Sequence, residues 1–280
     1  MTSKDSMTTL AENKEQPGSM YRLSSISLWA KLFLLIFGTL IPRIIVFLQP
    51  QIITNDGTLY IRMAKLFAEG KYGGTPGSYF SLYPFLIFLV QKFVGDWELS
   101  GQLISLTLGT LTVIPVFLLG RSLYDERMAW FSAIFYVTLP NLLKFDAQVI
   151  RDPTLWFFIL VTMWLIYEGL NRNQPLLIGL ASISAGLGAI TRVEGLIFWG
   201  VLALYVAFCR TQRIPIRRKA LNVAILVIIF PILLSAIFLS TKRDTNHIAV
   251  REMTSFSFNV IRGNVRAFLR PADPIARINI

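Results

Sequence analysis

The sequence has a single cysteine, Cys209, and a single histidine, His247, in 280 residues. One cysteine cannot form a disulfide within the chain or build a zinc site of the cysteine type. One histidine likewise argues against histidine-cluster metal sites and against a Ser-His-Asp triad. The chain also lacks an Asn-x-Ser/Thr glycosylation sequon. Metal and nucleophile chemistry built from ordinary cysteine and histidine parts is therefore not expected.

Charge is also scarce, since only 15% of the residues are charged while 54% are hydrophobic. The mean hydropathy of +0.57 is too high for a soluble domain of this size. Several apolar runs reach the length of about 20 residues that spans a bilayer. The net charge of +11 resides mainly in loops between these runs, which is the positive-inside pattern of membrane proteins. Membrane topology explains the basic residues better than nucleic-acid binding does.

These features predict an all-α polytopic membrane protein with about seven transmembrane helices. The predicted spans are residues 28–48, 98–119, 128–145, 154–170, 175–190, 195–209 and 220–240. Residues 1–27 would then form a cytoplasmic N-terminal tail, residues 28–240 one transmembrane module, and residues 241–280 a basic tail on the outer side. The first span is expected to be an uncleaved anchor. The strongest cytoplasmic marker is the basic loop 210–219.

The first outer loop, residues 49–97, is expected to hold amphipathic surface helices. Leu59 to Glu69 has apolar residues at helical spacing and ends at Gly70. Residues 79–94 are apolar but too short for a confident span, and we assign them to the surface because a span here would invert every later loop. The Gly/Pro-rich residues 71–78 between them are either a connector or a rim over a substrate site.

Two acidic residues stand at the starts of predicted helices on the outer side. Asp56 is either a helix cap or an ionised carboxylate that accepts a proton or binds a metal. Asp152 precedes Pro153 and a long apolar run, so it too is either a cap or a functional acid. The two acids could meet across one cavity, where they would be the ligands of any divalent ion, although no ligand set is compelling. Asp146 lies in the same short second outer loop.

Basic residues of the outer side are candidates for anion binding. Arg192 and Glu194 lie near membrane depth and form either a structural pair or a phosphate site, since a guanidinium binds phosphate with good geometry. Arg151 pairs with Asp152 or a lipid headgroup in the simplest interpretation. Arg43, at the outer end of the first span, could simply snorkel to the interface. Pro140 is expected to kink the third span.

The order of these residues resembles the GT-C superfamily of membrane glycosyltransferases. The nearest branch resembles the protein O-mannosyltransferase and aminoarabinose transferase group, which is glycosyltransferase family 39-like. The resemblance covers about residues 28–240. It is carried by Asp56, Tyr60, Ala64 and Gly70; by Leu82-Tyr83-Pro84; by Gly120 to Tyr124; by Arg151-Asp152; and by Thr191-Arg192-x-Glu194-Gly195.

The resemblance implies a hexosyl or pentosyl transferase that uses a polyprenyl-phosphate sugar on the outer face with inversion. Asp56 matches the catalytic base on the acceptor, Asp152 the second-loop acid, and Arg192 a basic residue near the donor phosphate. The further candidates for donor binding are Glu194, Arg151, Tyr60, Arg43 and Tyr83. A prokaryotic cytoplasmic membrane is the expected location, and lipid, protein and glycan remain open as acceptors.

Two departures from the family pattern bear on this interpretation. Many relatives have Asp-Glu where this chain has Asp56-Gly57, so any role of a second carboxylate is absent here. Most relatives also continue with more spans and an outer domain, which favours either a fragment or a partner subunit that recognises the acceptor. A transporter or flippase is the main alternative, although charges at mid-span in paired halves would be expected for it. A non-catalytic membrane subunit is the third hypothesis.

Overall fold

The computed structural model describes residues 27–70, 80–208 and 215–241, and all regular structure within these ranges is helical. The predicted all-α class is thereby confirmed. Helices occupy each of the seven predicted spans. The two tails, the Gly/Pro-rich residues 71–78 and residues 210–214 of the basic loop lie outside the described residues, as do Cys209 and His247.

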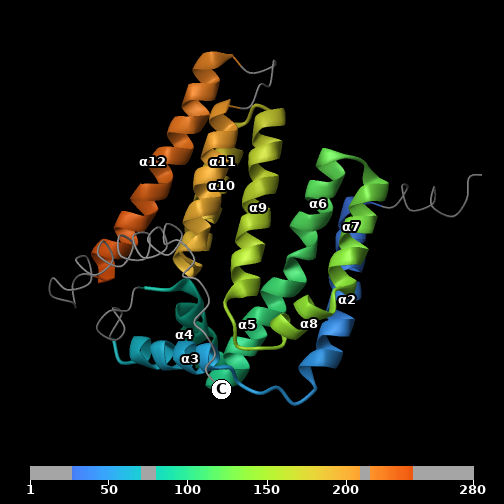
Figure 1. The fold of residues 1–280 in the computed structure, drawn as a ribbon, viewed down its shortest axis with the longest axis vertical. Helices are drawn as coiled ribbons and strands as arrows, with labels where there is room; N and C mark the ends of the chain where they lie inside the picture. The colour runs from blue at the N-terminus through green and yellow to red at the C-terminus, as the bar shows by residue number, and fades with distance from the viewer. Residues whose placement is uncertain (1–26, 71–79, 209–214, 242–280) are drawn as a thin grey trace, which may run out of the picture.

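The helices follow the chain in the order shown in Figure 1. They are α2 (Leu28–Phe47), α3 (Asn55–Ala68), α4 (Leu82–Val94), α5 (Trp97–Leu111), α6 (Val113–Leu123), α7 (Glu126–Thr138), α8 (Pro140–Asp146), α9 (Asp152–Asn171), α10 (Pro175–Thr191), α11 (Glu194–Phe208) and α12 (Ile216–Thr241). Within the described residues, three helical segments are long and apolar enough to cross a membrane. They are Leu28–Phe47, Trp97–Leu123 and Asp152–Asn171, and α4, α10 and α11 are shorter apolar helices.

The third predicted span is two helices rather than one kinked helix. Leu139 adopts an extended backbone with φ −70° and ψ 111°, and Pro140 occupies the first turn of α8. The residue before a proline is disfavoured in the helical region, because the proline ring clashes with it. The proline therefore ends α7 and begins α8, and this break places Asp146 at the end of α8.

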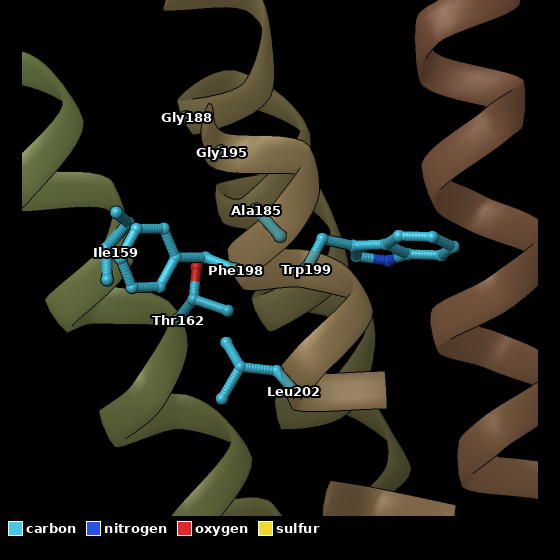
Figure 2. Close-up of a pocket in the computed structure, with 8 residues that line it drawn as sticks. All are labelled: Ile159, Thr162, Ala185, Gly188, Gly195, Phe198, Trp199 and Leu202. Carbon is cyan, nitrogen blue, oxygen red and sulfur yellow. The ribbon is translucent and has the colours of Figure 1, made fainter. Parts of the chain in front are cut away.

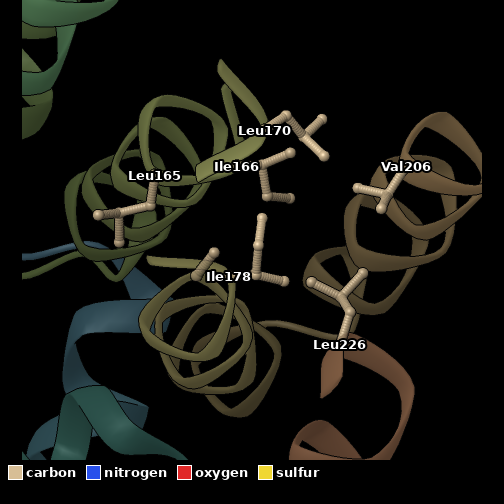
Figure 3. Close-up of a cluster of buried hydrophobic side chains, with 7 residues drawn as sticks. Leu165, Ile166, Leu170, Ile178, Val206 and Leu226 are labelled. Carbon is tan, nitrogen blue, oxygen red and sulfur yellow. The ribbon is translucent and has the colours of Figure 1, made fainter. Parts of the chain in front are cut away.

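The helices α9 to α12 share one apolar core. Ile166 and Leu170 of α9 face Ile178, Val206 and Leu226 from the other three helices, as Figure 3 shows, and Leu165 belongs to the same cluster. Close approach depends on the small residues of α10: a Cβ added to Gly186 would come within 2.5 Å of Leu233 Cδ2. Small residues at helix interfaces permit such packing in membranes, where burial of apolar surface alone does not drive helices together.

The helices α3 and α4 gather at one end of the bundle, and α3 runs across it rather than along the other helices (Figure 1). They pack on each other and on α5 through Tyr60, Ala64, Tyr83 and Ile87. The helix α3 begins at Asn55, four residues before the predicted start, because Thr54 caps it: the Thr54 hydroxyl accepts a hydrogen bond from Gly57 N at 3.1 Å. Asp56 is consequently not the cap.

Candidate active site

The loop between α8 and α9, which the sequence predicts as the second outer loop, is held against α5. Ser105 on α5 donates a hydrogen bond to the carbonyl oxygen of Ile150 at 2.9 Å. The Tyr83 hydroxyl lies 2.9 Å from Ser105 Oγ and 3.0 Å from the carbonyl oxygen of Gly101. Tyr83 is fully buried. Tyr83 therefore supports the loop through Ser105 and does not face open space.

Two glycines let helices approach this loop closely. A Cβ added to Gly101 would lie 2.7 Å from Val149 Cγ1. A Cβ added to Gly57 would lie 3.0 Å from the Val149 carbonyl oxygen and 3.3 Å from Val149 Cβ. The Gly57 position is therefore in contact with the loop itself. This contact is a physical reason for glycine beside Asp56, where many relatives are expected to carry a second carboxylate.

The turn between α10 and α11 pairs with the start of α9. Arg192 donates from Nη1 to Asp152 Oδ1, and from Nε and Nη2 to the two Glu194 oxygens at 3.2 and 2.8 Å. Asp152 is the first residue of α9, and the cap residue before it, Arg151, makes no side-chain cap bond. The hydrogen bonds with Glu194, and after them the charges of Asp152 and Glu194, raise the pKa of Arg192 above its usual range.

Tyr60, on α3, lies beside these charges. The Arg151 guanidinium sits over its ring at 5.5 Å from the centroid, and the Tyr83 ring meets it edge-on at 5.4 Å. Burial raises the pKa of Tyr60 to about 12, and the charges of Arg151, Asp56 and Asp152 all act on it. Asp56 is itself exposed and forms no ion pair within the described part of the chain. Three separate segments thus bring their charges together around Tyr60.

We call this constellation the outer cluster. Its members are Asp56, Tyr60, Arg151, Asp152, Arg192 and Glu194. A small apolar pocket, with space for about one water molecule, opens beside it between α9, α10 and α11. Figure 2 shows that Ile159 and Thr162 of α9 face Phe198 of α11 across this pocket, and that Gly188 and Gly195 lie at one end of it. These two glycines flank the Arg192–Glu194 turn, since Arg192 N donates to the carbonyl oxygen of Gly188 at 3.0 Å.

The acids of the outer cluster do not form a ready cation site by themselves. Among the described residues, no group of three or more His, Cys, Asp or Glu side chains is arranged to hold a metal ion. Asp152 and Glu194 both bind Arg192, whereas Asp56 stands apart from that pair. The geometry therefore offers one unengaged carboxylate and one shared guanidinium.

A family model described as dolichyl-phosphate-mannose-protein mannosyltransferase matches residues 81–238, more than half of the chain. The chain belongs to this mannosyltransferase family. It is accordingly a membrane glycosyltransferase of the GT-C type, and the resemblance drawn from the sequence is confirmed. The match includes Tyr83, Arg151, Asp152, Arg192 and Glu194. No curated protein and no solved structure matches the chain.

Arg43 of this glycosyltransferase lies in a second, buried polar site. Its Nε donates to Asp146 Oδ2 at 2.6 Å, its Nη1 donates to the Thr39 carbonyl oxygen at 3.3 Å, and its guanidinium lies 4.9 Å from the centre of the Tyr136 ring. Both charged side chains are completely buried. Arg43 therefore does not snorkel, and the structure does not place it with the outer cluster.

Reasoning from the sequence did not predict that Arg43 pairs with Asp146, or that Gly57, Gly101 and Gly109 are sites of close packing. Asp146 sits against α5 so closely that a Cβ on Gly109 would overlap its carboxylate. Tyr136 closes the site, because its hydroxyl donates to the Gly109 carbonyl oxygen at 2.6 Å. The only signal in the sequence was an aspartate and an arginine near the ends of two predicted spans. Neither spacing nor composition connects residues about a hundred positions apart.

Proposed function

We propose that this glycosyltransferase moves a sugar from a polyprenyl-phosphate donor to an acceptor hydroxyl on the outer face of the membrane, with inversion. The family description names dolichyl-phosphate mannose and protein. The donor class is carried over here, while the sugar and the acceptor stay open. The single observation that carries the proposal is the convergence of Asp56, Arg151-Asp152 and Arg192-Glu194 around Tyr60.

Arg192 is assigned to the phosphate of the donor. A guanidinium presents a planar fork of N–H donors that matches a phosphate, and a preorganised cation stabilises the charge that develops on a leaving group. Asp152 supports this role because its ion pair with Arg192 joins the start of α9 to the α10–α11 turn. Arg151 adds positive charge nearby while its guanidinium rests on Tyr60.

Asp56 is assigned as the general base. It lies in the first turn of α3, where the helix dipole favours the ionised carboxylate, and it is exposed to an incoming acceptor. In the reaction the acceptor oxygen bonds to the anomeric carbon, the bond from that carbon to the phosphate oxygen breaks, and Asp56 takes the hydroxyl proton. The transition state has oxocarbenium character. A base and a phosphate site on different elements suit attack opposite the leaving group.

The small apolar pocket marks a surface that suits a lipid-linked donor. It begins beside the Arg192–Glu194 turn and is lined by side chains such as Ile159, Phe198 and Leu202. A prenyl chain attached to a phosphate at Arg192 would meet this apolar surface at once. The outward orientation rests on the positive-inside pattern, since the basic loop 210–219 follows α11 at its end remote from the outer cluster.

The test is mass spectrometry of polyprenyl-phosphate sugars in membranes that express the wild type or Asp56→Asn. Accumulation of one glycolipid in the variant membranes alone is expected, together with loss of transfer and unchanged amounts of folded protein. Asp96→Asn is the matched control, since it removes the same charge from an exposed N-cap and asparagine caps equally well. Full transfer by Asp56→Asn would rule out the assigned base.

A further inference from the structure

Three of the five N–H groups of the Arg192 guanidinium are engaged by carboxylates, including both that form its Nε–Nη2 edge. Asp152 holds Nη1, while the two oxygens of Glu194 span Nε and Nη2. The edge between Nε and Nη2 is one that a phosphate uses for paired hydrogen bonds. A donor phosphate therefore cannot reach this edge of Arg192 until a carboxylate has left it.

The two carboxylates are held unequally. The Glu194 side chain is 49% exposed, whereas the Asp152 side chain is only 19% exposed. Asp152 is also the first residue of the long helix α9. Exposed ion pairs contribute little to stability, because water solvates the separated charges well. Arg192 has an extended backbone, with φ −149° and ψ 143°, and Glu194 follows only two positions later. Glu194 is thus the carboxylate that leaves at lower cost.

We propose that Glu194 occupies the phosphate position on Arg192 and is displaced from it by the donor. This inference rests on the proposed function and adds the step by which the donor enters. A phosphodiester carries one negative charge and two non-bridging oxygens, so it replaces the carboxylate in both charge and hydrogen bonding. Asp152 keeps the guanidinium aimed at the site throughout. Glu194 is then a competitor of the donor and not one of its ligands.

The experiment measures binding of farnesyl phosphate to the full chain in nanodiscs, with farnesol as the uncharged control probe. Glu194→Gln keeps the shape of the side chain but removes its charge. Because an exposed pair of this kind contributes little, farnesyl phosphate is expected to bind about twofold to fivefold more tightly to this variant. Binding of farnesol is expected to be unchanged. Glu194→Ser, whose side chain cannot form the paired hydrogen bonds with Arg192, should also bind farnesyl phosphate more tightly. Agreement between the two variants argues against a folding defect in the first.

Arg192→Gln supplies the second arm of the experiment. It is expected to weaken binding of farnesyl phosphate, and Glu194→Gln in that background should no longer strengthen it, since Glu194 acts only through Arg192. Unchanged or weaker binding in both Glu194 variants would overturn the displacement. If Arg192→Gln still weakens binding in that case, the proposed phosphate site stands without it. If Arg192→Gln has no effect on binding, the phosphate assignment fails as well.

Discussion

Replacing Asp146 with alanine is expected to destabilise the protein strongly, although the residue lies outside the outer cluster. The change removes the carboxylate that faces Arg43 Nε at 2.6 Å and leaves the guanidinium without its counter-charge. Thr39 O and the Tyr136 ring remain, but neither carries a charge. The arginine cannot turn to water, since its side chain is completely buried.

The magnitude follows from this burial. Breaking a buried ion pair by removing one partner costs about 3–5 kcal/mol, because an uncompensated charge stays behind. Replacing both partners with apolar groups is often neutral, so Arg43→Met combined with Asp146→Ala should recover most of the loss. The pair is also incompletely satisfied: Arg43 Nη2 and Asp146 Oδ1 lack hydrogen-bond partners within the described residues. That deficit favours recovery in the double variant.

Thermal unfolding in nanodiscs measures the effect. A loss of about 3 kcal/mol corresponds to a fall in melting temperature of roughly 6–12 °C, on the scale of soluble domains of 150–250 residues. The double variant is expected within a few degrees of the wild type. Asp96→Asn, at an exposed cap, is the control and should not move the transition. A melting temperature for Asp146→Ala close to that of the wild type would refute the argument from burial.

Three further changes test the loop and its supports. Gly57→Glu should reduce sugar transfer by roughly a hundredfold in an activity assay, because a side chain there meets the Val149 carbonyl and moves α3 away from the loop. Ser105→Ala should cost about 0.5–1.5 kcal/mol in thermal unfolding, since it removes the hydrogen bond to the part-buried carbonyl oxygen of Ile150. Tyr60→Phe should leave the alkaline side of the pH–rate profile unchanged, because a phenol with a pKa of about 12 stays protonated at working pH; a shift of that limb would assign Tyr60 a proton.

The sequence predicted helices well because their signals are local. The apolar runs located α2, α9 and α10 to within a few residues, and Gly70 correctly marked the end of α3. The errors arose where one residue type is compatible with two different local structures. Pro140 was expected to bend one helix and instead separates α7 from α8, and Thr54 took the capping role considered for Asp56.

The sequence predicted the members of the candidate site and offered the Arg192–Glu194 pair, but it did not predict the pair between Arg192 and Asp152. Arg192, Asp152 and Glu194 were all named from the sequence, and their ion pairs joined two turns that the predicted topology had already placed on one side. Arg43 was grouped with them for the same reason. Only the packing of α2 against α8 reveals that it faces Asp146 instead.

The sequence by itself determined a helical membrane protein with its acids and arginines collected at the ends of apolar runs, and its motifs resembled the GT-C superfamily. Hydrophobicity and charge determine the helices and the placement of the charged residues, because each residue is stabilised by lipid or water largely independently of distant residues. The tertiary structure alone decided which charges meet: Gly57 and Gly101 admit the second loop, Ser105 fixes it, and Arg192 thereby reaches Asp152. Such contacts depend on how side chains from distant segments fit together and which way they point. No local sequence pattern predicts that fit.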